Sequence, residues 1–357
     1  MSDTITLLKL LKEKKADAML LTSPHSIAYY TSFHGFALEE REGFALITQK
    51  NCFIMTSKLY AGAVTSLTLF KPLIYSQEKP FAKLLRQELR SEKITRLGVE
   101  ENNLTLSEYL SLKKLATIVP LHIRHLRIKK AANEVAAIKK ACTIADTALA
   151  NVKKQIKTGM SEKQIARLLE NEIRNLSGTI SFRPIVAFSE NAAIPHHLTS
   201  DKKLKTNDLI LIDFGAKVDG YCSDMTRTFF HGKPTEEQKK VYDIVLQAQQ
   251  KAIEYCKSQI ENSKSEEIKA NEVDKVTRDY IISQGFPSIP HSLGHGIGLE
   301  VHEPPYLGPG SKDTLGEGMV FSIEPGIYFP GKFGVRIEDL FVIQNGELIQ
   351  LTTAPKR

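Results

Sequence analysis

Two aspartates flank a predicted hairpin in the stretch LILIDFGAKVDGYCSDMTRTF, which covers residues 209–229. The pair Asp219-Gly220 between two apolar runs is typical of a two-residue hairpin turn. Counting outward from that turn places Asp213 opposite Thr226, and Asp224 then lies diagonal to Asp213 on the same face of the sheet. Two buried carboxylates at this spacing repel each other, and an unpaired one is costly to remove from water. The pattern therefore predicts a positive group between them.

That positive group could be a lysine, an arginine, a proton or a metal ion, and the two aspartates alone leave these alternatives open. Three further residues favour metal: Glu324 in VFSIEPGIY and Glu338 in GVRIEDLF each follow an apolar strand-like run, and His295 lies in SLGHGIGLEVHEPP. Four carboxylates and one imidazole suit two divalent cations, and the oxygen-rich set favours manganese, cobalt or zinc. Two such ions a few ångströms apart can bridge and deprotonate one water.

Other catalytic motifs fail on spacing. A dinucleotide-binding G-x-G-x-x-G would need glycine at position 299, where the chain has Leu299. His302-Glu303 cannot belong to a helical H-E-x-x-H zinc motif, because the prolines at 304 and 305 would break the helix. No G-x-S-x-G is present, which disfavours a serine hydrolase of the usual type.

The elements that must position these residues fall into two predicted domains, 1–126 and 127–357. The first alternates short apolar runs with helical patterns, which indicates an α/β layout. At the junction, residues 113–130 concentrate basic side chains, and we interpret this segment as a solvated linker. In the second domain, two helices followed by strands occur twice, which predicts two similar halves with a site between them.

Helix boundaries in the second domain can be predicted from capping signals. The first helix of the domain is expected from Asn133 to a stop at Gly159. Ser161 with Gln164, and later Thr235 with Gln238, match the capping box that begins a helix.

Composition describes an ordinary globular protein, with 42% hydrophobic and 25% charged residues. The N-terminal stretch is predicted to be an amphipathic helix rather than a secretion signal, and no apolar run reaches the length of a membrane span. Four scattered cysteines fit reduced thiols, so we expect a cytoplasmic protein. The net charge is +7, but no aromatic platform accompanies the basic residues, so we expect no nucleic-acid partner and no membrane partner.

Four motifs together resemble the metallopeptidase family that contains prolidase, aminopeptidase P and methionine aminopeptidase: LIDFGAKVDGYCSDMTRTF, PHSLGHGIGLEVHEPP, GMVFSIEPGIY and GVRIEDLFVI. The resemblance implies an α/β (α+β) protein, with an N-terminal creatinase/prolidase-type α/β domain and a pseudo-symmetric pita-bread catalytic domain. By motif position it implies a dinuclear centre with two divalent metal ions, manganese first and cobalt or zinc as alternatives. The implied ligands are Asp213, Asp224, His295, Glu324 and Glu338.

The same resemblance implies a set of substrate-binding residues. His196 in IPHHLTS and His302 match the family's substrate histidines, while His291 and Arg336 match residues of its Xaa-Pro branch. His197 is interpreted as an incidental neighbour of His196, because adjacent residues of a strand point to opposite faces.

The implied mechanism has three catalytic side chains. A hydroxide that bridges the metals attacks the scissile carbonyl, and His196 and His302 stabilise the tetrahedral intermediate. Glu324, also a ligand, relays the proton to the leaving nitrogen.

Within the family, LEVHEPPY and GVRIED favour cleavage of Xaa-Pro bonds. We expect an aminopeptidase that removes the first residue from peptides with proline in second position. The alternatives are a prolidase, which cuts Xaa-Pro dipeptides, and, more distantly, a non-catalytic binding module on the same fold. The segment SIAYYTSF resembles the N-terminal domain of relatives that are typically dimers, so a homodimer is expected.

Overall fold

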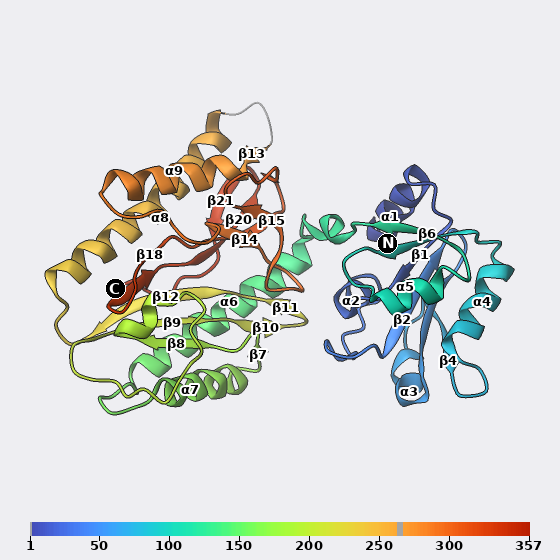
Figure 1. Ribbon diagram of the computed structural model, residues 1–357, viewed down its shortest axis with the longest axis horizontal. Coiled ribbons are helices and arrows are strands. Elements are labelled where there is room, and N and C mark those ends of the chain that lie inside the picture. Colours follow the sequence, from blue (N-terminus) through green and yellow to red (C-terminus); the bar gives the residue numbers. More distant parts are fainter. Residues whose placement is uncertain (1, 263–266) are drawn as a thin grey trace. The chain divides into compact units, whose positions relative to one another are not determined.

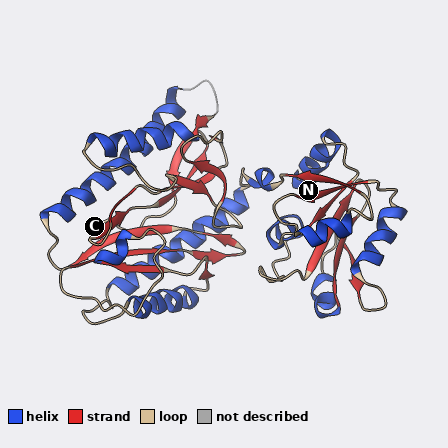
Figure 2. Cartoon of the chain, viewed as in Figure 1, coloured by secondary structure: helices blue, strands red, loops and turns tan. Residues whose placement is uncertain are grey.

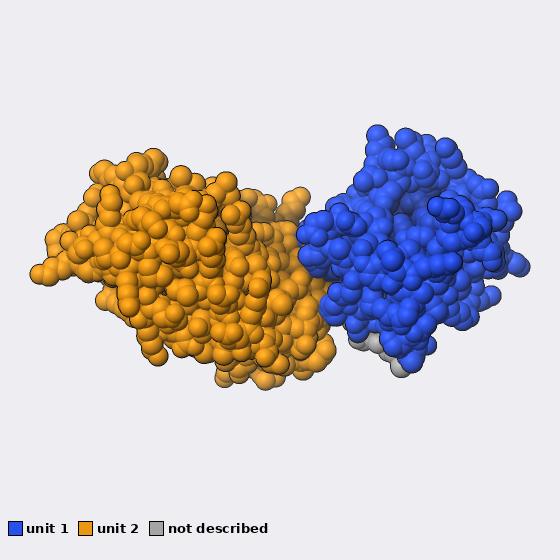
Figure 3. Space-filling model, turned by 90° about the horizontal axis from the view of Figure 1, so that it is seen from below, with its two compact units in different colours: residues 1–127 blue, residues 128–357 orange. Residues whose placement is uncertain are grey.

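The computed structural model describes residues 2–262 and 267–357, and the chain divides into a first compact unit up to Arg127 and a second from Ile128 onward (Figure 3). Each unit contains both helices and strands (Figure 2). The mixed α/β fold class expected from the sequence is confirmed.

The first unit is built on a six-stranded sheet in the order β4-β3-β2-β1-β5-β6. Its strands are β1 (Ala18–Leu21), β2 (Gly43–Thr48), β3 (Cys52–Ser57), β4 (Lys71–Tyr75), β5 (Arg96–Glu100) and β6 (Thr117–Leu121). Its helices are α1 (Ser2–Glu13), α2 (Pro24–Thr31), α3 (Ala61–Val64), α4 (Phe81–Ser91) and α5 (Leu106–Leu112), with 3₁₀ turns at Lys58–Tyr60 and Arg124–Arg127. Side chains of β1 alternate between two apolar cores, Met19 and Leu21 in one and Ala18 and Leu20 in the other. Both faces of the sheet are therefore covered, which explains the continuous apolar run.

The interpretation of residues 113–130 as a solvated linker is wrong. Residues Thr117–Leu121 form the edge strand β6, parallel to β5, and Arg127 and Lys130 are buried. The Lys130 ammonium lies 2.6 Å from the Glu303 carboxylate, and both side chains are buried. The prediction failed because a basic residue in a buried ion pair cannot be distinguished, from the sequence alone, from one that is exposed to solvent.

The second unit contains the strands of the candidate site between two helix pairs (Figure 1). The pair α6 (Ala132–Lys153) and α7 (Glu162–Asn175) packs on one core with β8 and β9, and the pair α8 (Glu236–Asn262) and α9 (Ala270–Ser283) packs on another. The strands are β7 (Thr179–Ile180), β8 (Ile185–Phe188), β9 (Asp208–Phe214), β10 (Ala216–Val218), β11 (Tyr221–Cys222), β12 (Met225–His231), β13 (Ile268–Lys269), β14 (Gly294–Gly296), β15 (Glu303–Leu307), β16 (Thr314–Leu315), β17 (Val320–Ile323), β18 (Gly326–Phe329), β19 (Phe333–Arg336), β20 (Asp339–Gln344) and β21 (Glu347–Gln350), and a 3₁₀ turn covers Ser189–Ala193.

Local signals in the second unit are confirmed at the helix starts. Ser161 and Gln164 form the expected capping box, and Gln238 likewise bonds to Thr235 at the start of α8. The helix expected to stop at Gly159 already ends at Lys153, because the chain there tightens into a turn.

Two sheets carry the ligand-bearing strands. One has the order β12-β9-β8, and the other has the order β15-β14-β17-β20-β21. The order of two helices followed by strands occurs twice, as the sequence pattern predicts.

Candidate metal and active site

All nine residues singled out in the sequence line one cavity of about 490 Å³, which is within the size range of small-ligand pockets. They are His196, Asp213, Asp224, His291, His295, His302, Glu324, Arg336 and Glu338. Apolar and aromatic side chains complete the wall, among them Phe182, Ile185, Val301 and Tyr306.

The first two carboxylates are held by the hairpin. Asp219 and Gly220 both have positive φ angles, 50° and 83°, as a type I′ turn requires. The register outward from this turn pairs Asp213 of β9 with Thr226 of β12, so the predicted pairing is confirmed. Asp224 lies just before β12 and reaches the same cavity as Asp213.

Between the turn and the two aspartates, the backbones of Gly215 and Ser223 lie in close contact. A Cβ atom built on Gly215 would lie 1.8 Å from the Ser223 carbonyl oxygen, so glycine is required there. The Ser223 hydroxyl accepts a hydrogen bond from the Ala216 amide at 2.9 Å. This contact sets the path of the chain into Asp224.

The other three predicted ligands come from neighbouring strands of the second sheet. His295 is the middle residue of β14, Glu324 follows β17, and Glu338 precedes β20. Because β14, β17 and β20 are adjacent in the sheet, these side chains meet at one place. The Thr226 hydroxyl donates to Glu338 at 2.7 Å, which ties the second set to the first.

The five residues approach one another closely enough to share metal ions. Ligand atoms of Asp213, Asp224 and Glu338 lie within 4.8 Å of one another, and so do those of His295, Glu324 and Glu338. Three buried oxygens, Asp213 Oδ1, Asp224 Oδ1 and Glu338 Oε1, have no hydrogen-bond partner among the described residues. Buried carboxylate oxygens without a donor are costly, and a divalent cation is a partner of the right charge.

Burial and mutual repulsion act on the protonation of the acidic residues. Burial first, and then the neighbouring Glu338 and Asp213, raise the pKa of Asp224 well above its usual value. Burial and Glu338 do the same to the pKa of Glu324. Burial and Asp213 raise the pKa of Glu338 to about 8. The carboxylates therefore need added positive charge to be ionised together at neutral pH.

His295 has the protonation state of a metal ligand. Burial and then His302 lower its pKa to about 3, so the ring is neutral. Its Nδ1 lies 3.1 Å from the Gly296 carbonyl oxygen and donates to it, which leaves a lone pair on Nε2. That Nε2 lies 3.4 Å from Glu324 Oε1 and 3.8 Å from Asp224 Oδ2. Three atoms that carry lone pairs thus face one another, as they do around a cation.

Arg336 supplies positive charge at one edge of the site. Its Nη2 donates to Asp213 Oδ2 at 2.5 Å, its Nε donates to the Thr226 hydroxyl at 3.0 Å, and its Nη1 donates to the Tyr328 hydroxyl at 3.0 Å. One arginine cannot balance four carboxylates, and the oxygens without partners remain beside it. Arginine was one of the positive groups considered between Asp213 and Asp224. Arg336 takes that role for one oxygen of Asp213.

Tyr328, which was not among the residues predicted from the sequence, connects Arg336 to His291. The His291 Nδ1 donates to the Ser292 carbonyl oxygen at 2.8 Å, and the ring Nε2 lies 2.9 Å from the Tyr328 hydroxyl. Burial lowers the pKa of His291 to about 4, so its neutral Nε2 accepts from Tyr328. Tyr328 lies four residues after Glu324 within the GMVFSIEPGIY motif, which was the available signal.

The two remaining histidines lie at the exposed side of the cavity. The His302 ring packs edge-on against His295, with 4.3 Å between ring centres. His196 is exposed in the loop after the Ser189–Ala193 turn. Both rings line the cavity, and a ring nitrogen of His302 lies within 4.8 Å of ligand atoms of Asp224 and His295.

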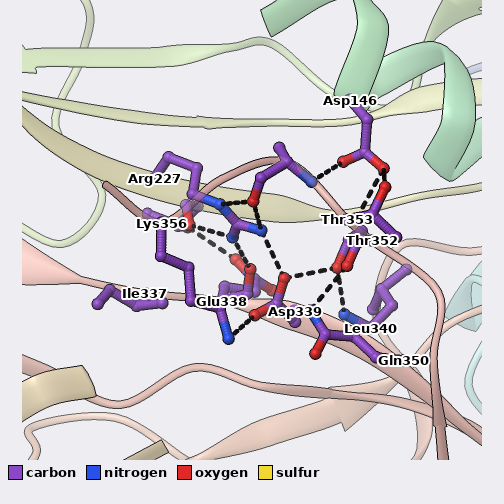
Figure 4. Close-up of polar contacts among 12 residues, drawn as sticks. Asp146, Arg227, Ile337, Glu338, Asp339, Leu340, Gln350, Thr352, Thr353 and Lys356 are labelled. Atoms are coloured by element: carbon purple, nitrogen blue, oxygen red, sulfur yellow. Dashed lines mark hydrogen bonds and ion pairs between the residues drawn. The ribbon is translucent and has the colours of Figure 1, made fainter. Parts of the chain in front are cut away.

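A buried polar network lies next to Glu338 (Figure 4). Arg227 donates to the Glu338 carbonyl oxygen at 2.6 Å and to the Asp339 carboxylate at 2.6 Å. Asp339 also accepts from Thr352 at 2.7 Å and pairs with Lys356 at 2.8 Å. These residues were absent from the sequence prediction because their partners lie more than a hundred positions apart or outside every motif.

The glycines around His295 allow close packing between strands. A Cβ on Gly294 would lie 2.0 Å from the Ser322 carbonyl oxygen, and one on Gly296 would lie 2.3 Å from the Pro304 carbonyl oxygen. Only glycine therefore lets β14 approach the chain segments on both sides. The contacts that require these glycines are therefore with neighbouring backbone.

The chain matches two known family models. Residues 136–345 match metallopeptidase family M24, and residues 6–129 match the creatinase/prolidase N-terminal domain. An Xaa-Pro dipeptidase of Pyrococcus horikoshii is 34% identical over 353 residues, which cover 97% of this chain and 95% of that protein.

Solved structures give the same result. An Xaa-Pro dipeptidase from Bacillus anthracis superposes with a TM-score of 0.91 at 34% identity, covering 100% of this chain and 98% of that one. An X-Pro aminopeptidase from Thermotoga maritima gives a TM-score of 0.85 at 32% identity, covering 96% and 97%. The fold and the site define a metallopeptidase. The chain belongs to metallopeptidase family M24 and is a metallo-exopeptidase with a peptide substrate and divalent metal ions.

Proposed function

We propose that this protein is an Xaa-Pro aminopeptidase, which removes the first residue from peptides with proline in second position. The observation that carries the metal-dependent part of the proposal is the set of three buried oxygens without partners on Asp213, Asp224 and Glu338. A hydrolase without metal would have no reason to bury these oxygens side by side.

We assign two divalent cations to the cavity, with manganese first and cobalt or zinc as alternatives. When all four carboxylates are ionised as metal ligands, Arg336 offsets the charge of one, so three negative charges are left in the cavity. That excess favours two divalent ions over one. The proposed ligands are Asp213, Asp224, His295, Glu324 and Glu338.

Divalent cations held there would supply Lewis acidity for the scissile carbonyl and lower the pKa of a water. The side chains of the protein perform the remaining tasks. His196 and His302 reach the cavity from its exposed side, where they can donate to the oxygen of the tetrahedral intermediate. Glu324 lies against His295 and can carry a proton to the leaving nitrogen.

His291 and Arg336 are the proposed binding residues for the remainder of the peptide. The guanidinium of Arg336 already donates to Asp213, Thr226, Tyr328 and, at 3.4 Å, to the Pro195 carbonyl oxygen. One N–H of Nη2 stays available for a substrate oxygen. An Xaa-Pro bond carries no N–H of its own, so recognition must rest on ring shape and on groups outside the bond.

A prolidase is the second candidate, and it is favoured by two relatives that are named Xaa-Pro dipeptidases, from Pyrococcus horikoshii and Bacillus anthracis. The Thermotoga maritima relative, named an X-Pro aminopeptidase, supports the first candidate. Both candidates share the metal site and differ in peptide length. The non-catalytic binding module stays the distant alternative.

The test is hydrolysis of an Xaa-Pro dipeptide and an Xaa-Pro-Yaa tripeptide by chelator-treated protein refilled with Mn²⁺, Co²⁺ or Zn²⁺. Release of the first residue from the tripeptide is expected. Cleavage of the dipeptide alone would replace this with prolidase, and no metal-dependent turnover of either would overturn both in favour of the binding module. Asp224→Asn should abolish turnover, while the matched exposed change Asp279→Asn on α9 should leave it unchanged.

A cytoplasmic homodimer that binds neither nucleic acid nor membrane remains our prediction. In the part of the chain that the structure describes, no helix has the length and apolar character needed to cross a bilayer. Sedimentation of the purified chain and fractionation of the cells that produce it would measure the two properties.

A further inference from the structure

A buried carboxylate outside the cavity accepts several hydrogen bonds from the loop that carries His196. Glu162 is the first residue of α7, and its side chain is fully buried. It accepts five hydrogen bonds, from the Phe188 amide, the Asn191 side chain, His197 Nε2, and the amide and hydroxyl of Ser200. All five donors belong to residues 188–200, which include the cavity residues Pro195 and His196.

Within this loop, His196 lies in a tight turn. The His197 amide donates to the Ile194 carbonyl oxygen at 3.1 Å, so Pro195 and His196 are the two central residues of the turn. The Ile194 amide in turn donates to the Asn191 carbonyl oxygen at 3.1 Å. The segment from Asn191 to His197 is therefore attached to the Glu162 carboxylate at both of its ends, at 2.8 Å in each case.

Apolar burial does not hold the tip of the loop. Ile194 and Leu198, on the two sides of the turn, are 54% and 76% exposed. His197 is 10% exposed in its side chain, because its ring contacts Glu162, while His196 is exposed and lines the cavity. With exposed neighbours on both sides, polar anchors must set where His196 lies.

The anchor is a charged one. Burial alone would raise the pKa of Glu162, but the hydrogen bonds from Ser200, His197, Asn191 and Phe188 together lower it. Hydrogen bonds to an ionised carboxylate are stronger than neutral ones and more restrictive in geometry.

We propose that Glu162, through its hydrogen bond with His197, holds His196 at the cavity, and that both are positioning residues for the substrate-contacting histidine. The inference rests on the proposed function, in which His196 contacts the reacting peptide. It replaces the interpretation of His197 as an incidental neighbour. Neither residue lines the cavity, so both act through His196.

The test compares two replacements of His197. His197→Leu removes the donor to Glu162, and His197→Gln keeps an N–H donor on a side chain of similar reach. With saturating metal and an Xaa-Pro-Yaa substrate, His197→Leu should lower kcat/KM by roughly tenfold to a hundredfold, the size expected when a catalytic group moves by about 1 Å. His197→Gln should stay within about threefold of the parent protein, and metal content should be unchanged in both.

A double-variant cycle with His196→Ala separates positioning from general damage. If His197 acts through His196, adding His197→Leu to His196→Ala should cost less than about twofold more. An equal loss in both backgrounds, or equal damage by His197→Gln, would overturn the proposal. If His197→Leu does not fold, Ser200→Ala replaces it, because that change removes one donor and keeps the Ser200 amide bond.

A second readout keeps the inference separate from the proposed activity. In protein with ¹³C-labelled histidine, the His196 ring signal can be assigned by its loss in His196→Ala. It should shift in His197→Leu and not in His197→Gln. If the parent protein hydrolyses no Xaa-Pro peptide, the proposed function fails while this spectrum still tests the anchor, and an unmoved His196 signal would overturn it.

Discussion

Arg227 and Asp339 form a fully buried ion pair with a distance of 2.6 Å, and Asp339 directly follows Glu338 in the chain. Arg227 also donates to the Glu338 carbonyl oxygen, so the ion pair is hydrogen-bonded to the backbone of a proposed ligand (Figure 4). Gln249 of α8 donates a hydrogen bond of 3.0 Å to the Ile323 carbonyl oxygen, one residue before the proposed ligand Glu324. Ligands from separate strands thus share one buried support.

Asp339→Asn should weaken both the fold and the metal site. The change leaves Arg227 and Lys356 facing an amide instead of a carboxylate, and removing one partner of a buried ion pair costs about 3–5 kcal/mol. Metal affinity should fall by about tenfold to a hundredfold, as for other groups that orient ligands. Denaturant unfolding and metal titration measure the two effects. Asp243→Asn, which alters an exposed pair with Arg357, should change the unfolding free energy by less than about 0.5 kcal/mol; equal effects of the two changes would refute the argument.

Gly215→Ala should be far more damaging than an ordinary glycine replacement. Its Cβ would collide with the Ser223 carbonyl oxygen and push apart the strands that carry Asp213 and Asp224. We expect a loss of about 2–3 kcal/mol in unfolding free energy and reduced metal content. Gly62→Ala, in α3 with no atom within 4 Å of the new Cβ, should be neutral or stabilising by up to about 1 kcal/mol. A tolerated Gly215→Ala would show that this contact does not position Asp224.

The metal-free protein should lose stability as the pH rises. Glu338 has a pKa raised from 4.5 to about 8 in the folded state, so the folded protein holds this proton more tightly than the unfolded chain. The resulting stabilisation is complete below pH 4.5 and is lost as the pH rises towards 8. We expect a fall of about 4 kcal/mol in unfolding free energy across that range.

Denaturant unfolding of chelator-treated protein at several pH values measures this slope. Glu338→Gln, which cannot ionise, should make the slope shallower without abolishing it, because Asp224 and Glu324 also have raised pKa values. Because metal ions compete with protons for the same oxygens, metal affinity in the parent protein should rise over the same pH range. A slope as steep in Glu338→Gln as in the parent protein would assign the effect to the other carboxyl groups.

Tyr328→Phe should reduce turnover without emptying the metal site. The change removes the hydroxyl between Arg336 and His291 and keeps the ring, so we expect a loss of about 1 kcal/mol in stability. The kcat/KM for an Xaa-Pro-Yaa peptide should fall by about tenfold, because Arg336 and His291 lose a shared partner. Tyr280→Phe on α9 is the matched control and should leave turnover unchanged. Undiminished turnover in Tyr328→Phe would show that this hydroxyl has no part in substrate binding.

The hairpin and the ligand types could be predicted from the sequence because they depend on local rules. A two-residue turn at Asp219-Gly220 sets the strand register, and that register places Asp213 opposite Thr226 whatever the rest of the chain does. The capping box at Ser161 is equally local, since donor and acceptor lie three residues apart.

Other features could not be predicted, because their partners are distant in sequence. Lys130 looks like one charge in a basic run, and only its contact with Glu303, 173 positions away, makes it a buried residue. Glu162 has the appearance of an ordinary first-turn acid until the loop of residues 188–200 folds over it.

The sequence by itself determined which side chains could bind metal and how the first two pair across a hairpin, because side-chain chemistry and turn geometry act over a few residues. Tertiary structure alone decided which oxygens of Asp213, Asp224 and Glu338 are left without donors and which nitrogen of His295 keeps its lone pair. Those properties depend on which hydrogen-bond donors and acceptors the neighbouring strands place nearby, and no spacing along the chain encodes that.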